Sequence, residues 1–394
     1  MASAAPLAPP APAIDWQGFE PTPAAALRCL QAVRPHDYAR SRNHLQGAVT
    51  GLSPYITHGL LTLPQVLDAV QQAELARCGK PLDGEHKFIN ELAWREYFHH
   101  AWRHEGRRIF ASLHEGPLPD GAYARQVDAD IRAGATGVPA IDQAVRQLYA
   151  TGWLHNHARM WLASYMVHLR KVHWRAAADW MYGHLIDGDL ASNHLSWQWV
   201  AGTGSHKPYL FNAGNVARFA SEAWHSPRSV IDRSYEALEA IATSGKRLQP
   251  APGGAAPQAV DEPALTHEPP FELPRATAAD LDGAWLIHPW NLRAAPSGRP
   301  AGQRGVGVFV APFHKRWAWS ARRWQFVLAA MREHCDTVVW CGAPPPATAR
   351  TVADPHLGGW WPDGRGEPVP RIWADPGRRC GSFSQFWNRI QKAR

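Results

Sequence analysis

Carboxylate, amide and indole side chains gather in one short stretch of the sequence, residues 174–199. Asp187, Asp189 and Asn193 lie at its centre, and Trp197 follows one turn later if the segment is helical. The neighbouring residues are mostly apolar, as buried residues are. Because a buried polar group is unfavourable unless something hydrogen-bonds to it, this stretch predicts a large ligand that is both polar and aromatic.

A second group of functional side chains falls on one face of a helix predicted over residues 87–103. Phe88, Glu91, Trp94 and Arg95 recur at helical spacing, so a carboxylate, an indole and a guanidinium share this face. Two interpretations remain open. Glu91 and Arg95 form an ordinary surface ion pair, or the charged face lines a ligand pocket.

A third helix is predicted over residues 154–172, and it is apolar almost all round, which indicates burial. Asn156 and Arg159 nevertheless share one of its faces. A buried arginine requires an anion, and chemistry favours Asp187 or Asp189 as its partner.

Glycine and proline flank Ser53, so residues 50–55 are predicted to form a tight loop, with a helix beginning near Pro64. Hydroxyl groups and free backbone amides in such a loop can hold phosphate. A simple capped turn is the commoner interpretation of this motif when it stands alone.

No metal site is predicted. His155 and His157 are two residues apart and point to different sides of a helix. The cysteines form no Cys-x-x-Cys pair, which argues against structural zinc or an iron–sulfur cluster. These scattered thiols suit a reducing cytoplasm, and they are Cys29, Cys78, Cys335, Cys341 and Cys380.

The composition of the 394-residue chain is that of a globular protein, with 45% hydrophobic and 19% charged residues. A formal charge of +7 favours polyanionic partners, nucleic acid first among them. No window is apolar for long enough to cross a membrane. The expected location is therefore the cytoplasm.

The predicted fold is mainly α, with a small α/β part at the end. A flexible Ala/Pro-rich tail is expected over residues 1–24 and an all-helical domain over 25–245. A linker rich in Pro, Ala and Gly follows at 246–275. Short β-prone runs alternating with a helix predict a small α/β domain over 276–394.

Basic and aromatic residues alternate at 314–324, a pattern that single-strand binding proteins use. The alternative is a solvated helix start whose tryptophans pack inward, and we favour it. No catalytic motif follows Arg275.

The region from about residue 25 to 242 resembles the helical flavin domain of the DNA photolyase/cryptochrome family. Four motifs, in the order and with the spacing of the family, carry this resemblance. They are Leu52-Ser53-Pro54-Tyr55, Glu91-Leu92-Ala93-Trp94-Arg95-Glu96, Thr151-Gly152-Trp153-Leu154-His155-Asn156 with Arg159-Met160, and Asp187-Gly188-Asp189-Leu190-Ala191 with Asn193 and Trp197-Gln198-Trp199.

The resemblance implies that FAD is the cofactor. It puts Asp187 and Asp189 along the isoalloxazine and ribityl chain, Asn193 opposite flavin N5, and Arg159 in a pair with Asp187. Five further residues fall near the diphosphate, and Gly188 completes the aspartate segment. The residues assigned to FAD are Tyr38, Thr50, Leu52, Ser53, Arg95, Arg159, Asp187, Gly188, Asp189 and Asn193.

The resemblance also implies a pocket for a flipped-out pyrimidine dimer, lined by Glu91, Trp94, Asn156, Met160 and Trp199. Indole faces would stack on the pyrimidines, while Glu91 and Asn156 satisfy their polar edges. Glu91, in its protonated form, would stabilise the dimer radical anion. The implied activity is light-driven repair of cyclobutane pyrimidine dimers by an electron from reduced flavin.

Trp197 and Trp174 match the first two carriers of the family's electron relay. The position of the third carrier falls in residues 111–151, which contain no tryptophan. The outer carrier is therefore left unassigned among other aromatic residues, namely Trp161, Trp180 and Tyr182.

The sequence departs from the family pattern at its start, where the tail replaces the α/β domain that holds an antenna chromophore. No antenna chromophore and no protein partner are therefore assigned. The smaller DNA-facing surface would favour single-stranded DNA. The alternatives to repair are a cryptochrome-like blue-light photoreceptor and a flavin-binding protein that neither repairs nor signals.

Overall fold

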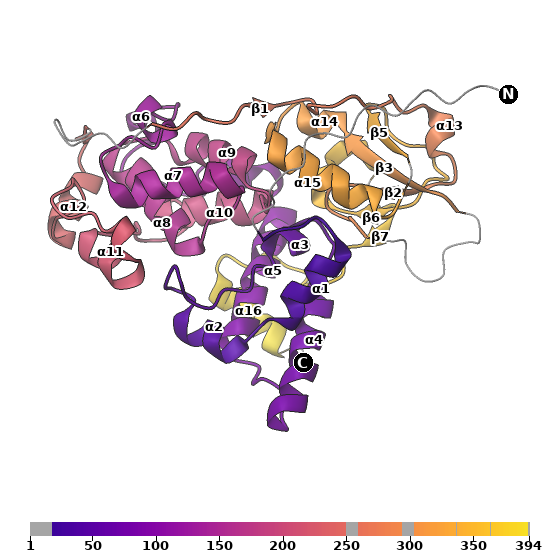
Figure 1. The fold of residues 1–394 in the computed structure, drawn as a ribbon, viewed down its shortest axis with the longest axis horizontal. Helices are drawn as coiled ribbons and strands as arrows, with labels where there is room; N and C mark the ends of the chain where they lie inside the picture. The colour runs from indigo at the N-terminus through magenta and orange to yellow at the C-terminus, as the bar shows by residue number, and fades with distance from the viewer. Residues whose placement is uncertain (1–17, 250–258, 294–302, 336, 363, 393–394) are drawn as a thin grey trace.

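Helices dominate the structure, as predicted, and a small parallel sheet is formed by strands between residues 285 and 341 (Figure 1). The predicted tail over residues 1–24 and the centre of the predicted linker fall mostly outside the described residues. The computed structural model describes residues 18–249, 259–293, 303–335, 337–362 and 364–392.

The helices between residues 23 and 242 form the largest part of the molecule, and short 3₁₀ turns separate several of them. The α-helices are α1 (Pro23–Gln31), α2 (Pro35–Ser41), α3 (Ser53–Thr57), α4 (Leu63–Cys78), α5 (Lys87–Glu105), α6 (Ala129–Arg132), α7 (Pro139–Thr151), α8 (Asn156–Ser164), α9 (Trp174–His184), α10 (Leu190–Ala201), α11 (Ala213–Phe219) and α12 (Tyr235–Ala242). The 3₁₀ turns are η1 (Gly106–Phe110), η2 (Asp120–Ala122) and η4 (Glu222–Trp224).

The elements after residue 260 are shorter. The helices are α13 (Ala278–Leu281), α14 (Ala311–His314), α15 (Ala321–Arg332), the 3₁₀ helix η5 (Pro355–Trp360) and α16 (Phe383–Lys392). The strands are β1 (Leu265–Thr266), β2 (Trp285–Ile287), β3 (Gly305–Val310), β4 (Trp319–Ser320), β5 (Val338–Cys341), β6 (Val352–Ala353) and β7 (Glu367–Pro368).

Side chains at the helix ends account for where the site helices begin. His86 caps α5, and its ring accepts a hydrogen bond from Phe88 N. Asp189 caps α10 in the same way through Ser192 N. Both caps satisfy a backbone N–H that the helix itself leaves unpaired.

The predicted helix over 154–172 is divided in two. Regular α8 ends at Ser164 and continues as a π-helix, η3 (Tyr165–Leu169). Lys171 then has a positive φ of 53°, which no α-helix can contain. The predicted burial of this segment is confirmed, because η3 is buried throughout.

The C-terminal sheet is parallel, with strand order β2-β3-β5, and α15 crosses from β3 towards β5. Val327 and Met331 on α15 are fully buried. This part confirms the predicted alternation of short strands with a helix.

The basic and aromatic segment 314–324 is not an open surface. Trp319 and Trp324 are fully buried, and Trp317 is nearly so. Arg323 is buried as well. The interpretation as a single-strand binding surface is therefore wrong, and inward packing of the tryptophans is confirmed.

The buried apolar side chains form two clusters that do not follow the predicted domain division. One cluster combines the N-terminal helices up to η1 with most of the C-terminal part, and the other lies mainly within residues 123–248. Helix α16, yellow in Figure 1, lies among the indigo N-terminal helices. There Phe383 stacks on Trp94 of α5, with ring centroids 4.1 Å apart.

The described end of the predicted linker is held against the helices. Glu262 accepts a hydrogen bond from Trp180 Nε1 at 2.8 Å and pairs with Arg132 at 3.0 Å. Leu265 and Thr266 then pair with β4. Residues 259–266 therefore connect the two parts by defined contacts.

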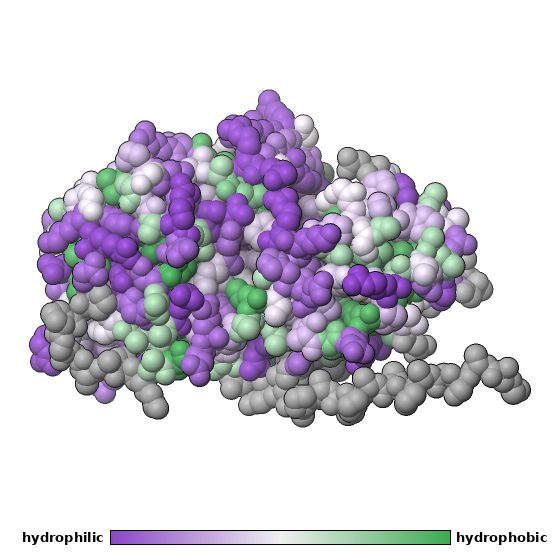
Figure 2. Space-filling view, turned by 90° about the horizontal axis from the view of Figure 1, so that it is seen from above, coloured by the Kyte–Doolittle hydropathy of each residue, from purple (hydrophilic) through white to green (hydrophobic). Residues whose placement is uncertain are grey.

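The face in Figure 2 is mostly hydrophilic, with small hydrophobic groups between the polar ones. Within the described ranges, no helix combines the length and the apolar character that crossing a bilayer requires.

Candidate functional site

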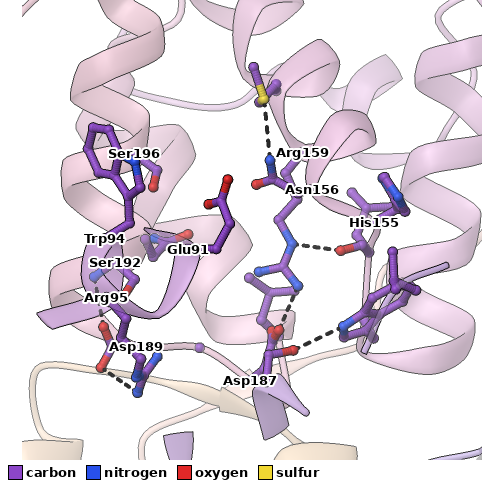
Figure 3. A pocket seen from close by; sticks show the side chains of 18 of the residues that line it. Glu91, Trp94, Arg95, His155, Asn156, Arg159, Asp187, Asp189, Ser192 and Ser196 are labelled. Carbon is purple, nitrogen blue, oxygen red and sulfur yellow. Dashed lines mark hydrogen bonds and ion pairs between the residues drawn. The ribbon is translucent and has the colours of Figure 1, made fainter. Parts of the chain in front are cut away.

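A cavity of about 370 Å³ lies where α5, α8 and α10 meet the segments around α2 and α3. Its volume falls within the range of small-molecule and cofactor sites. Figure 3 shows that polar side chains from these separate helices point into it. Most of the predicted site residues line this cavity, namely Tyr38, Thr50, Ser53, Glu91, Trp94, Arg95, Asn156, Arg159, Met160, Asp187, Gly188, Asp189, Asn193 and Trp197.

Arg159 and Asp187 form the ion pair that the sequence predicted. Arg159 Nη2 lies 2.7 Å from Asp187 Oδ2, and Arg159 Nε donates to Leu154 O at 2.7 Å (Figure 3). The Asp187 carboxylate is almost fully buried. Its second oxygen, Oδ1, has no hydrogen-bond partner in the described structure. An unpaired buried acceptor on a cavity wall indicates that a ligand donates to it.

Asp189 carries a second set of interactions. Its Oδ2 lies 2.9 Å from His99 Nε2 and 3.4 Å from Arg95 Nη2, while Oδ1 accepts from Ser192 N at 2.7 Å. Burial alone would raise the pKa of Asp189, but the nearby charges of His99 and Arg95 outweigh it and hold the pKa well below the usual value. Asp189 is therefore a carboxylate at neutral pH.

The loop that carries both aspartates is held from behind through its backbone. Thr57 donates to Asp187 O at 3.2 Å, and a ring nitrogen of His58 lies 2.7 Å from Ile186 O. Arg323 of α15 donates to Gly188 O at 2.5 Å. These contacts fix the loop before any ligand binds.

Gly188 has no room for a side chain. A Cβ at this position would lie 2.5 Å from Arg323 Nη1 and 2.9 Å from Tyr182 O. Glycine therefore lets the loop pack directly on Arg323.

Glu91 does not pair with Arg95, so the interpretation as a surface ion pair between these two residues is wrong. Glu91 Oε1 instead lies 2.9 Å from Lys87 Nζ and 3.5 Å from Arg42 Nε. The carboxylate points into the cavity between Trp94 and Asn156 (Figure 3). The pocket-wall interpretation of this helix face is confirmed.

Two amides line the cavity with defined orientation. Asn193 Nδ2 donates to Ala178 O at 2.9 Å, which leaves Oδ1 as an acceptor facing the cavity. Asn156 Nδ2 lies 3.5 Å from Met160 Sδ. The Asn193 orientation follows from its partner, since a carbonyl can only accept.

Three predicted site residues lie outside the cavity wall. The Leu52 side chain is buried in the apolar core, so it packs and does not face the cavity. Trp174 is buried and donates from Nε1 to Ser112 Oγ at 3.0 Å. Trp199 is 40% exposed and packs beside Tyr209, outside the lining of this cavity.

The sequence reasoning missed His99, which holds Asp189, and the residues that hold the loop from behind, Arg323 among them. His99 lies four residues after Arg95 on the same face of α5, so helical periodicity alone contained the signal. Arg323 lies 135 and 141 residues from the two backbone carbonyls that it binds, and no local pattern indicated it.

His155 and His157 do not form a metal site. His155 caps α8 by accepting from His157 N, and burial lowers the pKa of both rings to about 4. In the described ranges, the one trio close enough to share an ion is His100, His104 and Asp375. Asp375 is already paired with Arg103, whose charge opposes a cation.

Residues 88–228 match the sequence model of the family described as "FAD binding domain of DNA photolyase". This part of the chain belongs to the photolyase/cryptochrome family. FAD is the cofactor that such a domain binds.

Related proteins are similar to part of this chain. A deoxyribodipyrimidine photo-lyase of Synechococcus sp. is 34% identical over 222 residues, which cover 52% of this chain and 44% of the relative. One of Streptomyces griseus is 37% identical over 177 residues, covering 43% of this chain and 36% of the relative. The matches thus span less than half the length of these relatives.

The solved structure of a Synechocystis sp. PCC6803 cryptochrome aligns with a TM-score of 0.45 at 28% identity, over 50% of this chain and 43% of that one.

The residues of the FAD-binding domain fit their cofactor. Asp187 Oδ1 and Ser192 Oγ are buried on the cavity wall and have no hydrogen-bond partner among the described residues. Asn193 Oδ1 adds an acceptor, and Arg159 and Arg95 add positive charge. A cofactor with a polar heteroaromatic ring and a diphosphate would satisfy both kinds of group.

Proposed function

We propose that this protein repairs cyclobutane pyrimidine dimers in DNA by light-driven electron transfer from FAD. The observation that carries the proposal is one shared cavity, in which the aspartate and Asn193 side lies opposite Glu91, Trp94 and Asn156. The photo-lyase names of the relatives support the same reaction. When bound in its reduced form, FAD absorbs blue light and supplies the electron that opens the cyclobutane ring.

The cofactor side of the cavity works by holding polar groups in fixed positions. Asp187 and Asp189 would accept hydrogen bonds from the flavin ring and ribityl chain, since each is oriented by its own cation. Asn193 would accept from a protonated ring nitrogen through Oδ1, since Nδ2 uses one of its two N–H groups on Ala178 O. Tyr38, Thr50, Ser53 and Arg95 remain the proposed diphosphate contacts.

The lesion side combines a stacking surface with polar groups. Trp94 has one face covered by Phe383, so Phe383 holds the indole in position for a base on the cavity side. Glu91 and Asn156 would hydrogen-bond to the pyrimidine edges, and Met160 adds an apolar contact. Trp199 lies at the surface, one turn after Ser196 of the cavity wall, and would contact DNA beside the lesion.

A preference for single-stranded DNA belongs to the same proposal. Flipping a dimer out of a single strand costs no base pairing, so the cavity needs to supply less binding energy. Arg42 and Lys87, beside Glu91, provide positive charge near the site of entry for the DNA backbone. The cytoplasm remains the proposed compartment, since all the described cysteines are free thiols.

Purified protein with FAD tests the proposal directly. Absorption spectra would be recorded before and after photoreduction, and repair would be measured on an oligothymidine that contains cyclobutane dimers, as single and double strands under blue light. We expect repair that requires light, and faster repair of the single strand. Photoreduced protein that leaves every dimer intact contradicts the proposal.

A Glu91→Ala variant should repair dimers about tenfold or more slowly while it still binds FAD, because it loses a hydrogen bond to charge that develops on the lesion. The measurements are the repair rate under saturating light and the FAD absorbance of the purified variant. Glu239→Ala, on the exposed face of α12, is the matched control. Equal repair rates in Glu91→Ala and Glu239→Ala would remove Glu91 from the lesion side.

Electron supply during photoreduction is proposed to run through Trp197 and Trp174, which belong to one buried core on the packed helices α9 and α10. Of the three candidates for an outer carrier, none has a ring contact with Trp174 in the described structure. The ring centroid of Trp174 instead lies 5.8 Å from that of His173. The His173 centroid lies 6.2 Å from the ring centroid of Tyr123. Tyr123 is thus the better-placed outer carrier.

A Trp174→Phe variant should photoreduce much more slowly than the natural protein, because phenylalanine is harder to oxidise. A smaller loss is expected for Tyr123→Phe. The measurement is the loss of oxidised-flavin absorbance under blue light with an external reductant, and Trp224→Phe, which contacts Trp161, is the control. Unchanged photoreduction in Trp174→Phe would rule out this route.

The alternative function is that of a cryptochrome-like blue-light photoreceptor. The packing of Phe383 on Trp94 favours it, because a change at the cavity would be passed to α16. Light-dependent protection of α16 in hydrogen exchange, together with a lack of repair, would support the photoreceptor over the enzyme.

A further inference from the structure

A second cavity, of about 310 Å³, lies between the helical part and the C-terminal part of the chain. One wall comes from α5 and the segment between α3 and α4. The other comes from residues 290–293, 352–356 and 368–371. Apart from Arg95 and Asp189, which line both cavities, the residues of this second cavity have no part in the proposed repair.

The cavity presents hydrogen-bond donors that have no acceptor. Trp290 Nε1 and Asn291 Nδ2 are buried, and neither has a partner in the described part of the chain. Asn291 is only 1% exposed, and both residues line the cavity. Unpaired buried donors are costly, so the site calls for a ligand that accepts hydrogen bonds.

Arginine side chains add positive charge to the same cavity. Arg293 donates to Asn291 Oδ1 at 2.9 Å, and no described carboxylate lies within ion-pair distance of it. Arg103 and Arg371 share a single carboxylate, Asp375, at 2.6 and 3.3 Å. Asp375 thus serves two guanidinium groups, while Arg293 on the same cavity has no paired carboxylate among the described residues, so an anionic group such as a phosphate would complete the set.

The acidic groups of the cavity are already occupied. Glu96 accepts from Ile372 N at 2.6 Å, and Asp354 pairs with His356 at 2.6 Å. Asp189 is bound by His99 and Arg95. Because the carboxylates of the cavity already have partners while the N–H donors of Trp290 and Asn291 have none, a cationic ligand is disfavoured.

The rest of the wall is apolar and suits a flat ring. The apolar lining consists of Ile56, Leu61, Leu63, Val352, Ala353, Pro355, Pro368, Val369 and Pro370.

Burial lowers the pKa of Arg293 and of Arg371, in the latter case aided by the charge of Arg103. An anion beside these two guanidinium groups would reverse this effect.

We propose that the second cavity binds a mononucleotide, with its phosphate at Arg293 and Arg371 and its heteroaromatic ring against the apolar wall. Trp290 and Asn291 donate to acceptor atoms of this ligand. Arg95 and Asp189 line both cavities, so the mononucleotide lies directly behind the wall of the FAD site. The inference does not depend on dimer repair.

Calorimetric titration of the FAD-loaded full chain tests the site. Adenosine monophosphate and flavin mononucleotide are the probes, and adenosine and inorganic phosphate supply the two halves of the ligand separately. We expect saturable 1:1 binding of at least one mononucleotide, and binding of adenosine and phosphate that is at least about tenfold weaker. Failure of both mononucleotides to bind overturns the proposal, as does phosphate that binds as tightly as they do.

Two variants locate the binding. Arg293→Gln removes one guanidinium, and Asn291→Asp keeps the acceptor for Arg293 while adding a negative charge that repels phosphate. Each should weaken mononucleotide binding by at least about tenfold, and Arg316→Gln, exposed in the same part of the chain, should not. Because Asn291→Asp barely changes shape, it serves if Arg293→Gln fails to fold. Unchanged binding in a folded variant of either kind overturns the site.

Discussion

An Arg323→Ala variant is expected to lose on the order of 3 kcal/mol of unfolding free energy and most of its FAD. Arg323 is fully buried and donates to Tyr182 O at 3.0 Å as well as to Gly188 O. Its guanidinium also lies 4.1 Å from the ring centroid of Trp319. Alanine would leave two buried carbonyls unpaired and open a cavity behind the loop that carries Asp187 and Asp189.

Urea denaturation and the FAD absorbance of the purified protein measure the two losses. Arg332→Ala, exposed on the same helix, should change stability little and keep its FAD. Arg323→Lys should resemble Arg323→Ala, because one ammonium cannot reproduce the forked contacts of a guanidinium. An Arg323→Ala protein with normal stability and full FAD content would show that the loop is held by other contacts.

The second large effect is expected for Asp189→Asn. Asparagine is a good helix cap, so the start of α10 should be preserved while the charge is lost. The half-buried guanidinium of Arg95 would then lose its carboxylate, and His99 would lose its partner. We expect a loss of about 3 kcal/mol and weak FAD binding at neutral pH.

The pH dependence of this loss follows from the sign of the pKa shift. The folded pKa of Asp189 is depressed, so its contribution is fully present above the unfolded pKa of about 4 and disappears as the pH falls through the folded value. The stability difference between natural and Asp189→Asn protein should therefore shrink below about pH 4. Urea denaturation at a series of pH values measures it.

Asp179→Asn provides the comparison for the second prediction. Asp179 pairs with Arg175 and His194 but lines neither cavity. Its replacement should leave FAD bound. If Asp189→Asn kept as much FAD as Asp179→Asn, the charge of Asp189 would have no role in the cofactor site.

Local patterns predicted the site helices well because the chemistry of each lies within a few turns. Phe88, Glu91, Trp94 and Arg95 share one face of α5, as helical spacing required. The Arg159–Asp187 pair was foreseen because a buried arginine needs an anion. The sequence pattern alone did not predict that Arg95 pairs with Asp189 and not with Glu91, since both carboxylates are within the reach of its side chain.

Tertiary packing determines which aromatic side chains are exposed to solvent. Trp197 and Trp199 belong to the same motif, yet Trp197 is buried on the cavity wall and Trp199 is exposed. The tryptophans of 314–324 looked like a nucleic-acid surface, but β4 and α15 turn them inward. Exposure depends on the neighbours of a helix, which a local pattern does not specify.

The sequence by itself determined the mainly helical fold, the cofactor class and most residues of the first cavity, because helix periodicity and family motifs act over short distances. Only the tertiary structure decided which residues from distant segments pack against the cavity residues and hold them in place. Arg323 of α15 holds the loop of Asp187 and Asp189 through Gly188 O, and α16 covers one face of Trp94. The second cavity exists only because the C-terminal part packs on α5. Contacts between segments so distant in sequence arise from burial of shared apolar surface, and no local spacing encodes them.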